Sequence, residues 1–208
     1  MKLIQTKDGS FTAHNAEFDE TYHSISGAAE EAFEKHVKAL GIQEGMKVLD
    51  FCFGLGYNSL AATTMASNLE ITALENDVKI VQEMKHLNLS GRLGNKFKIF
   101  SELTDKSEIT DSDGNTIKLI IDDAKQTVKA LPKNYFDIVY FDPFSPKKQP
   151  EMWTEEILRD VYSVMKNGGK LSTYSCAKSV RANMTAAGFI VKDGPSVGRK
   201  SPATIAIK

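Results

Sequence analysis

An apolar segment that runs into a glycine turn lies at residues 47–58 of this 208-residue sequence. Residues 47–51 have the pattern of a buried strand, Gly54 and Gly56 form the turn, and the alanines at 61 and 62 belong to a following helix. Glycines in such a turn let a ligand approach bare backbone N–H groups at the start of the helix. The segment therefore predicts a ligand-binding turn of an α/β fold, although a turn that serves only packing would have the same sequence.

Strand and helix patterns alternate along the whole chain. An amphipathic helix is expected at residues 27–40, and Thr154 can cap another helix that has Glu155 and Glu156 in its first turn. We therefore expect an α/β, Rossmann-like fold, with a mostly parallel seven-stranded sheet in a single domain that spans residues 1–208. The expected strands are residues 47–51, 70–74, 118–121, 136–141, 170–175, 189–193 and 204–207.

Two turns predict hairpins. Asp8-Gly9 and Asp113-Gly114 each stand between strand-like flanks, and this dipeptide favours a tight hairpin turn. The first turn predicts an N-terminal hairpin appendage, which would form a lid segment within residues 1–25.

The composition excludes several classes of protein. With 41% hydrophobic and 25% charged residues the chain can bury a core, which argues against a disordered protein. No stretch approaches the roughly 20 apolar residues of a membrane span, so we expect no membrane association and a cytoplasmic location. Cys52 and Cys176 lack the spacing of a metal site and are expected to be buried thiols, and no metal is expected.

Positive charge is concentrated at the C-terminal end. Residues 141–208 contain 11 basic and 6 acidic residues, a balance of +5, whereas the whole chain carries −1. Such a surface can bind a polyanion, although solvated side chains would explain it equally well. The candidate phosphate contacts are Lys147, Lys148, Lys178, Arg181, Arg199 and Lys200.

Glu75 follows the glycine turn by about twenty residues and ends the next strand, where an acidic side chain can accept hydrogen bonds from both hydroxyls of a ribose. The turn lacks the third glycine of the pyrophosphate-binding pattern, which favours an adenosyl ligand without phosphates over NAD or FAD. After the next strand, Asp123 and Ala124 stand where they could meet the adenine edge. Gly54, Gly56, Asn58, Glu75, Asp123 and Ala124 are therefore the predicted cofactor contacts, although any of these acids could instead cap a helix.

A further strand delivers Asp142 to the carboxyl edge of the sheet, where open α/β folds bind their ligands. Pro143-Phe144-Ser145-Pro146 follows, and its two prolines hold the loop rigid. An aromatic ring beside a carboxylate could stack on a base while the carboxylate accepts a hydrogen bond from an amine.

These motifs resemble one known family over nearly the whole chain: the methyltransferase half of the bifunctional tRNA wobble-uridine enzyme MnmC, and its stand-alone relatives. The longest and most specific part of the resemblance is the run from Asp142 to Thr154. The other segments that carry it are Thr6-Lys7-Asp8-Gly9-Ser10, Tyr22-His23-Ser24, Gly27-Ala28 with Glu30, Phe53-Gly54-Leu55-Gly56-Tyr57-Asn58, Leu74-Glu75, Asp123-Ala124-Lys125-Gln126, Thr173-Tyr174-Ser175, Val180-Arg181 and Ala187-Gly188-Phe189.

The resemblance implies a specific reaction. It is methyl transfer from S-adenosylmethionine to the exocyclic amine of 5-aminomethyl-(2-thio)uridine, the wobble base in the tRNA anticodon stem-loop. Asp142 is then expected to orient the amine and Phe144 to stack on the uracil ring. Tyr22 and Ser24 resemble the family's lid on the cofactor, and Tyr174 stands near the substrate's entry. No FAD is expected, because the FAD-dependent oxidase half is absent. No obligate protein partner is evident from the sequence.

Three positions depart from the family's usual pattern: Lys125 replaces Arg, Pro143 replaces Ala, and Ser201-Pro202-Ala203 replaces a charged continuation after Lys200. The last departure weakens the assignment of tRNA contacts near the C-terminus. Three other functions remain open on the same residues. These are an aminopropyltransferase of the spermidine-synthase kind, a methyltransferase of small-molecule amines, and a tRNA-binding module without catalysis.

Overall fold

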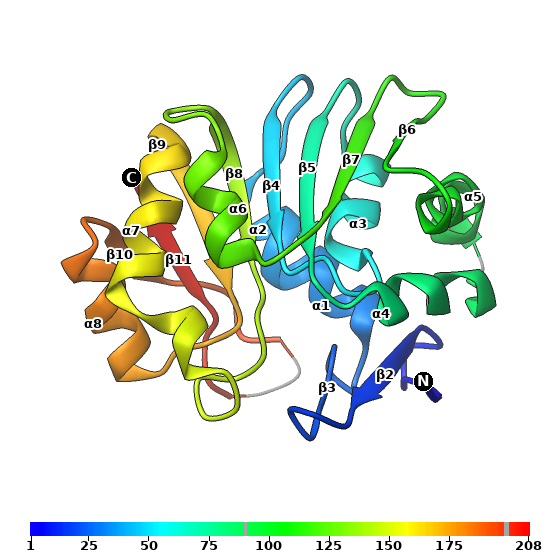
Figure 1. Cartoon of the computed structure of the whole chain (residues 1–208), viewed down its shortest axis with the longest axis horizontal. Coiled ribbons are helices and arrows are strands. Elements are labelled where there is room, and N and C mark those ends of the chain that lie inside the picture. Colours follow the sequence, from blue (N-terminus) through cyan, green and yellow to red (C-terminus); the bar gives the residue numbers. More distant parts are fainter. Residues whose placement is uncertain (90, 198–199) are drawn as a thin grey trace.

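The computed structural model describes residues 1–89, 91–197 and 200–208. These residues form one large sheet with helices on both faces, and a small sheet beyond one end of it (Figure 1). The strands of the large sheet are β4 (Lys47–Phe51), β5 (Glu70–Glu75), β6 (Glu108–Thr110), β7 (Thr116–Ile121), β8 (Phe136–Phe141), β9 (Met165–Thr173), β10 (Ile190–Asp193) and β11 (Thr204–Ile207). Their order is β10-β11-β9-β8-β4-β5-β7-β6, and the central pairs from β9 to β7 are parallel. The predicted α/β fold is confirmed.

The large sheet has eight strands among the described residues, so the predicted number of seven was wrong. The additional strand, β6, pairs antiparallel with β7 across the predicted turn at Asp113-Gly114. Its three residues are too few to show a periodic pattern, and only Ile109 of the three is buried. Pairing with β7, rather than the sequence of the segment alone, makes it a strand.

One continuous helix precedes β4, as predicted, but its middle turn is a π-helix. It consists of α1 (Ala28–Glu31), η1 (Ala32–Val37) and α2 (Lys38–Leu40), and it ends at Gly41 with a left-handed φ of 69°. The π turn changes which side chains face the sheet, and it buries Lys35 and His36 together with Val37. The other helices are α3 (Tyr57–Met65), α4 (Val78–Glu83), η2 (Met84–His86), α5 (Gly91–Phe100), η3 (Ser101–Thr104), α6 (Ala124–Ala130), η4 (Pro150–Trp153), α7 (Glu155–Val164) and α8 (Lys178–Ala186).

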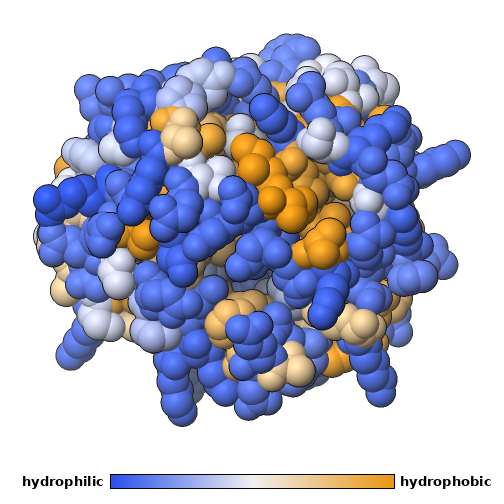
Figure 2. Space-filling model, viewed as in Figure 1, coloured by the Kyte–Doolittle hydropathy of each residue, from blue (hydrophilic) through white to orange (hydrophobic). Residues whose placement is uncertain are grey.

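Helices cover the two faces of the sheet in separate groups. Buried side chains of α1 to α3 and α5 form one apolar cluster with the sheet, and those of α6, α7 and α8 form the other. The second group lies in front in Figure 1. Thr154 caps α7 as predicted, because its hydroxyl accepts a hydrogen bond from the Ile157 N–H. Figure 2, in the same view, shows the front face of the molecule as mostly hydrophilic, with a hydrophobic patch near its centre.

Both cysteines are partly exposed, so the prediction of two buried thiols was wrong. Cys52 directly follows β4, and Cys176 lies three residues after the end of β9, so neither lies within a strand. Cys52 has a left-handed φ of 72° where the chain turns away from β4. Separately, none of the helices formed by the described residues has the length and apolar character needed to cross a bilayer.

The small sheet is the predicted N-terminal hairpin with one more short strand. It contains β1 (Leu3–Gln5), β2 (Phe11–Asn15) and β3 (Glu20–Thr21), and β1 pairs with β2 around the Asp8-Gly9 turn. The Asp8 carboxylate accepts hydrogen bonds from Thr6, from the N–H and hydroxyl of Ser10, and from the Glu30 N–H. This carboxylate therefore ties the hairpin to the start of α1.

We expect Asp8→Asn to destabilise the protein by about 1 kcal/mol at pH 7. Burial alone would raise the pKa of Asp8, but hydrogen bonds from Ser10, Thr6 and Glu30 outweigh burial and lower that pKa from 3.8 to about 2. The native state thus favours the ionised form. The stabilisation is complete above the unfolded pKa of 3.8 and is lost as the pH falls through 2. Urea unfolding at pH 7 and at pH 2.5 should show a smaller difference between variant and wild type at the lower pH, and an equal difference would contradict this account.

Candidate functional site

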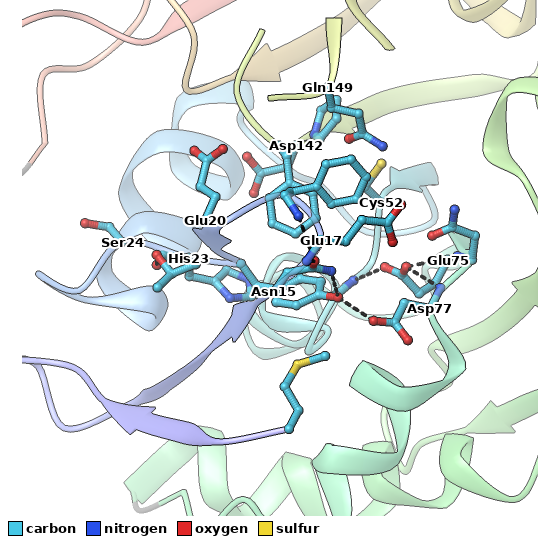
Figure 3. A pocket seen from close by; sticks show the side chains of 18 of the residues that line it. Asn15, Glu17, Glu20, His23, Ser24, Cys52, Glu75, Asp77, Asp142 and Gln149 are labelled. Atoms are coloured by element: carbon cyan, nitrogen blue, oxygen red, sulfur yellow. Dashed lines mark hydrogen bonds between the residues drawn. The ribbon is translucent and has the colours of Figure 1, made fainter. Parts of the chain in front are cut away.

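A cavity of about 610 Å³ lies between the N-terminal sheet and the carboxyl ends of β4, β5 and β8 (Figure 3). Its volume is within the range of small-molecule sites. Seven of the residues predicted for the site line it: Tyr22, Ser24, Gly54, Glu75, Asp142, Phe144 and Tyr174.

Glu75 lies on one side of the cavity and is held by backbone N–H groups. Gly54 donates to its Oε2 at 2.7 Å, and Asn76 and Asp77 donate to its Oε1 at 2.9 Å each. The residue is 6% exposed, and burial raises the pKa of its carboxyl despite these hydrogen bonds. A carboxylate has about four acceptor positions, so Glu75 retains one position for a ligand hydroxyl. The side chain fits the ribose of an adenosyl group.

The two glycines of the turn have different tasks. Gly54, with a φ of 57°, lines the cavity, and a Cβ there would stand 3.5 Å from the Tyr22 ring. Gly56, with a φ of 78°, begins α3, and a Cβ there would come within 2.4 Å of the Phe53 ring. Gly54 thus leaves space beside the cavity, whereas Gly56 is required by packing inside the protein.

Tyr22 closes the cavity from the N-terminal segment. Its hydroxyl donates to Asp77 Oδ2 at 2.7 Å and accepts from Asn15 Nδ2 at 3.0 Å, and dashed lines mark these contacts in Figure 3. Asp77 also accepts from the Lys79 N–H at the start of α4. One network therefore joins the lid segment to the loop that follows Glu75. Ser24 lies in the same segment, where its N–H donates to Glu31.

Asp142 follows β8 and faces the cavity with one side of its carboxyl group. Asn58 donates from Nδ2 to Asp142 Oδ2 at 3.3 Å. Burial, followed by the neighbouring charge of Glu31, raises the pKa of Asp142 from 3.8 to about 6. At neutral pH this carboxylate is a stronger proton acceptor than an exposed aspartate. Asn58, predicted as a cofactor contact, is buried, does not line the cavity and instead bonds Asp142.

Phe144 lies in a loop whose backbone carbonyls are anchored by two side chains. Its carbonyl accepts from Trp153 Nε1 at 2.8 Å, and Tyr174 donates from its hydroxyl to the Pro143 carbonyl at 3.1 Å. Its ring stacks on Phe18 with centroids 4.7 Å apart, and the Tyr22 ring meets it edge-on. The ring face that Phe18 covers is closed to a base in this conformation.

Several predicted residues lie outside the lining of the cavity. Asp123 caps α6 by accepting from the Lys125 N–H, and Ala124 is buried, so their contact with adenine stays a prediction. Lys147 and Lys200 are exposed and form no ion pair with the described residues. Lys148 pairs with Asp19.

Arg181 is already occupied by contacts within the fold. Its guanidinium donates to the Thr204 hydroxyl, the Asp193 carboxylate and the Ala203 carbonyl, which joins α8 to β10 and β11. These contacts leave few donors for a phosphate. Arg199 lies outside the described residues.

The sequence did not indicate a second polar group beside Asp142. Glu31 and Lys35 line the cavity and form an ion pair in which both side chains are nearly buried. Their i,i+4 spacing on the helix was visible, but such a pair usually lies on an exposed face. Among the described residues no group of three or more His, Cys, Asp or Glu side chains could hold a metal ion.

Comparison with known proteins identifies related sequences and structures. The sequence profile of a family described as S-adenosyl-L-methionine-dependent methyltransferase matches residues 95–208. An uncharacterized protein of Methanocaldococcus jannaschii is 34% identical over 215 residues, which cover 99% of this chain and 59% of that protein. The tRNA 5-methylaminomethyl-2-thiouridine biosynthesis bifunctional protein MnmC of Cupriavidus metallidurans is 26% identical over 225 residues, which cover 98% of this chain and 33% of that protein. The chain thus spans less than two thirds of the length of either relative.

A solved structure is similar along almost the whole chain. The crystal structure of MNMC2 from Aquifex aeolicus superposes with a TM-score of 0.83 and 27% sequence identity, and the match covers 99% of this chain and 70% of that one. The resemblance noted in the sequence is confirmed by these similarities.

Proposed function

This chain belongs to the S-adenosyl-L-methionine-dependent methyltransferases, and we propose that it methylates the exocyclic amine of 5-aminomethyl-(2-thio)uridine at the wobble position of tRNA. The product is 5-methylaminomethyl-(2-thio)uridine. The observation that carries the proposal is that one cavity joins Glu75, which fits a ribose, to Asp142 and Phe144, which fit an amine on a flat ring. The similarity to MnmC proteins, which are named for tRNA 5-methylaminomethyl-2-thiouridine biosynthesis, supports the choice of base.

The proposed cofactor contacts are divided between the two sides of the cavity. Glu75 accepts a hydrogen bond from a ribose hydroxyl, and Gly54 lets the ligand approach the turn. Tyr22 and Ser24 cover the ligand from the lid segment. We retain Asp123 and Ala124 as adenine contacts because they follow β7, the next parallel strand after β5.

S-adenosylmethionine supplies a methyl group on a positively charged sulfur, and the acceptor amine must be neutral to attack it. Asp142 orients the amine by accepting a hydrogen bond from it. When the C–N bond forms, the bond between the methyl group and the sulfur breaks and leaves a neutral thioether. The amine gains a positive charge and then releases one proton. Asp142 takes up that proton, for which its raised pKa suits it. The buried site excludes water from the charged reactants.

Phe144 supports the base. The uracil ring stacks on Phe144, which places the aminomethyl group near Asp142, two residues earlier in the same loop. The Phe18 ring must move away from Phe144, or hold the base from the other side, for this contact to form.

Methyl transfer from labelled S-adenosylmethionine into anticodon stem-loops tests the proposal. We expect incorporation into a stem-loop that carries 5-aminomethyluridine and none into the matched stem-loop with unmodified uridine. Equal incorporation into both stem-loops would exclude 5-aminomethyluridine at the wobble position as the specific substrate. Methylation of free amines but not of RNA would favour a small-molecule methyltransferase, and aminopropyl transfer from the decarboxylated cofactor would favour a polyamine synthase. Binding of tRNA without cofactor affinity would indicate a non-catalytic module.

Salt should weaken binding of the stem-loop only moderately. Lys148 and Arg181 already bond to acidic side chains, so Lys147, Lys178 and Lys200, which are exposed and form no ion pair with the described residues, remain as candidate cations for phosphates. Three contacts at a slope of roughly 0.7 each predict about 18-fold weaker binding between 50 and 200 mM salt. A titration of labelled stem-loop should also show a flatter salt dependence for Lys147→Ala. Glu151→Ala, in the same loop, serves as the control, and an unchanged slope in Lys147→Ala would exclude Lys147 from the interface.

A further inference from the structure

The two oxygens of the Asp142 carboxyl group have different surroundings. Oδ2 lies 3.3 Å from Asn58 Nδ2 and 3.7 Å from His36 Nε2. Oδ1 has no hydrogen-bond partner among the described residues, and the side chain lines the cavity. Oδ2 therefore faces polar groups inside the protein, and Oδ1 is free to accept a hydrogen bond from a ligand.

His36 is completely buried in the π-helical turn η1, directly behind Asp142. Its Nδ1 is 2.9 Å from the hydroxyl of Ser172, which is equally buried on β9. Its Nε2 has no hydrogen-bond partner among the described residues. A buried polar atom without a partner is costly, so its direction toward Asp142 calls for a reason.

The Ser172 contact determines what His36 can offer to Asp142. If the serine hydroxyl donates to Nδ1, the ring proton is on Nε2, and Nε2 is then a donor that faces Oδ2. The separation of 3.7 Å exceeds a hydrogen bond, and a shift of about 0.5 Å would close it. Burial, only partly opposed by the charge of Glu31, lowers the pKa of His36 to about 4, so the ring donates as a neutral imidazole.

We propose that His36 is a positioning residue for the methyl-transfer reaction. Ser172 fixes the tautomer of His36, and His36 and Asn58 together hold Oδ2 of Asp142 inside the protein. Oδ1 alone then accepts a hydrogen bond from the acceptor amine. This inference rests on the proposed function. The positioning role gives a reason for burying a neutral histidine, which forms no ion pair, in this helix. It also gives a role to the π turn, which places His36 on the inner side of the helix.

Other charged and titratable groups surround this pair and set the background for any pH dependence. Glu31 and Lys35 come from the same helix and neutralise each other. His23 of the lid segment is buried, and burial lowers its pKa. Asp50 on β4 bonds Ser59, and burial raises its pKa to about 8. Tyr140 on β8 meets the His36 ring edge-on. Since none of these groups donates to Oδ2, replacing His36 should affect Asp142 directly.

The test compares His36→Leu, which removes the donor, with His36→Gln, whose amide can donate from nearly the same place. With S-adenosylmethionine and the aminomethyl stem-loop, we expect kcat to fall about tenfold in His36→Leu, as for loss of one hydrogen bond to a charged group. The acidic limb of its pH profile should move up by about one pH unit, because the carboxylate has lost a donor that favours the ionised form. The Gln variant should recover most of both losses, and Ser172→Ala should lie between Leu and wild type. Cofactor affinity should be unchanged in all three.

A second readout separates this inference from the proposed function. The carboxyl group of Asp142, labelled with ¹³C and assigned by comparison with Asp142→Asn, can be titrated by NMR in the cofactor complex without any RNA. We expect a higher pKa in His36→Leu than in wild type, whether or not the stem-loop is a substrate. If His36→Leu does not fold, the same measurements on Ser172→Ala and His36→Gln test the positioning role. Titration curves identical to wild type, or a kcat loss that Gln does not restore, would overturn the positioning role.

Discussion

Asp142→Asn should bind S-adenosylmethionine as tightly as wild type and lose about 100-fold or more in single-turnover methylation. The amide keeps the size of the side chain, and its oxygen can still accept from Asn58 Nδ2. It removes the negative charge that offsets the ammonium group formed in the transition state, and it removes the proton acceptor. The expected loss is therefore in the chemical step and not in cofactor binding.

The pH dependence provides an independent check on Asp142. Burial, with Glu31 nearby, raises the pKa of this carboxyl to about 6, so the ionised form is present above that pH and is lost below it. Protonation of the acceptor amine lowers the rate of both proteins as the pH falls. Well below pH 6 the wild-type rate should show a further tenfold fall per pH unit, and Asp142→Asn should lack this further fall. Glu151→Gln, which removes a carboxylate from the same exposed loop, should behave as wild type. A wild-type rate in Asp142→Asn would leave the residue with a structural role only.

The sequence predicted the parts of the fold that depend on local patterns. The strand at residues 47–51, its glycine turn and the cap at Thr154 are all local, and the structure contains them. The turn at Asp113-Gly114 was predicted, but the three residues of β6 that pair with β7 across it were not counted as a strand of the large sheet. The partial exposure of the two cysteines depends on their neighbours in the fold, and the sequence did not reveal it. The helix at residues 91–100 was missed too, because its sequence contains glycine at 91 and 94, which disfavours a helix.

The same distinction applies to the cavity. Glu75 and Asp142 end parallel strands, and strand ends meet at one edge of a sheet, so their proximity was predictable. Glu31, Lys35 and His36 reach the site from a helix whose register shifts at a π turn. A regular helical period assigns different residues to the inner face, and no pattern in the sequence marks the shift. Phe18 reaches Phe144 through the pairing of β2 with β3, which is equally invisible to periodicity.

Replacing Glu75 should weaken cofactor binding and also the turn that forms the site. The carboxylate accepts from three backbone N–H groups, of Gly54, Asn76 and Asp77, besides any ribose hydroxyl. In Glu75→Ala these donors lose their acceptor, and each one that finds no water costs about 1–3 kcal/mol of stability. In Glu75→Gln one oxygen remains for Asn76 and Asp77, so the fold should suffer less.

Both Glu75 variants should bind S-adenosylmethionine about tenfold to hundredfold more weakly than wild type, because the ribose loses a hydrogen bond to a charged acceptor worth roughly 1.5–3 kcal/mol. Calorimetric titration below each variant's unfolding temperature measures this loss, and thermal unfolding measures the loss of stability separately. Glu70→Gln, at the opposite and exposed end of the same strand, is the control and should keep wild-type affinity. If Glu75→Gln is folded and binds with wild-type affinity, the ribose does not contact Glu75. The adenosyl group would then have to lie elsewhere in the cavity. The proposal that the cofactor binds on the Glu75 side and the substrate on the Asp142 side would also be wrong.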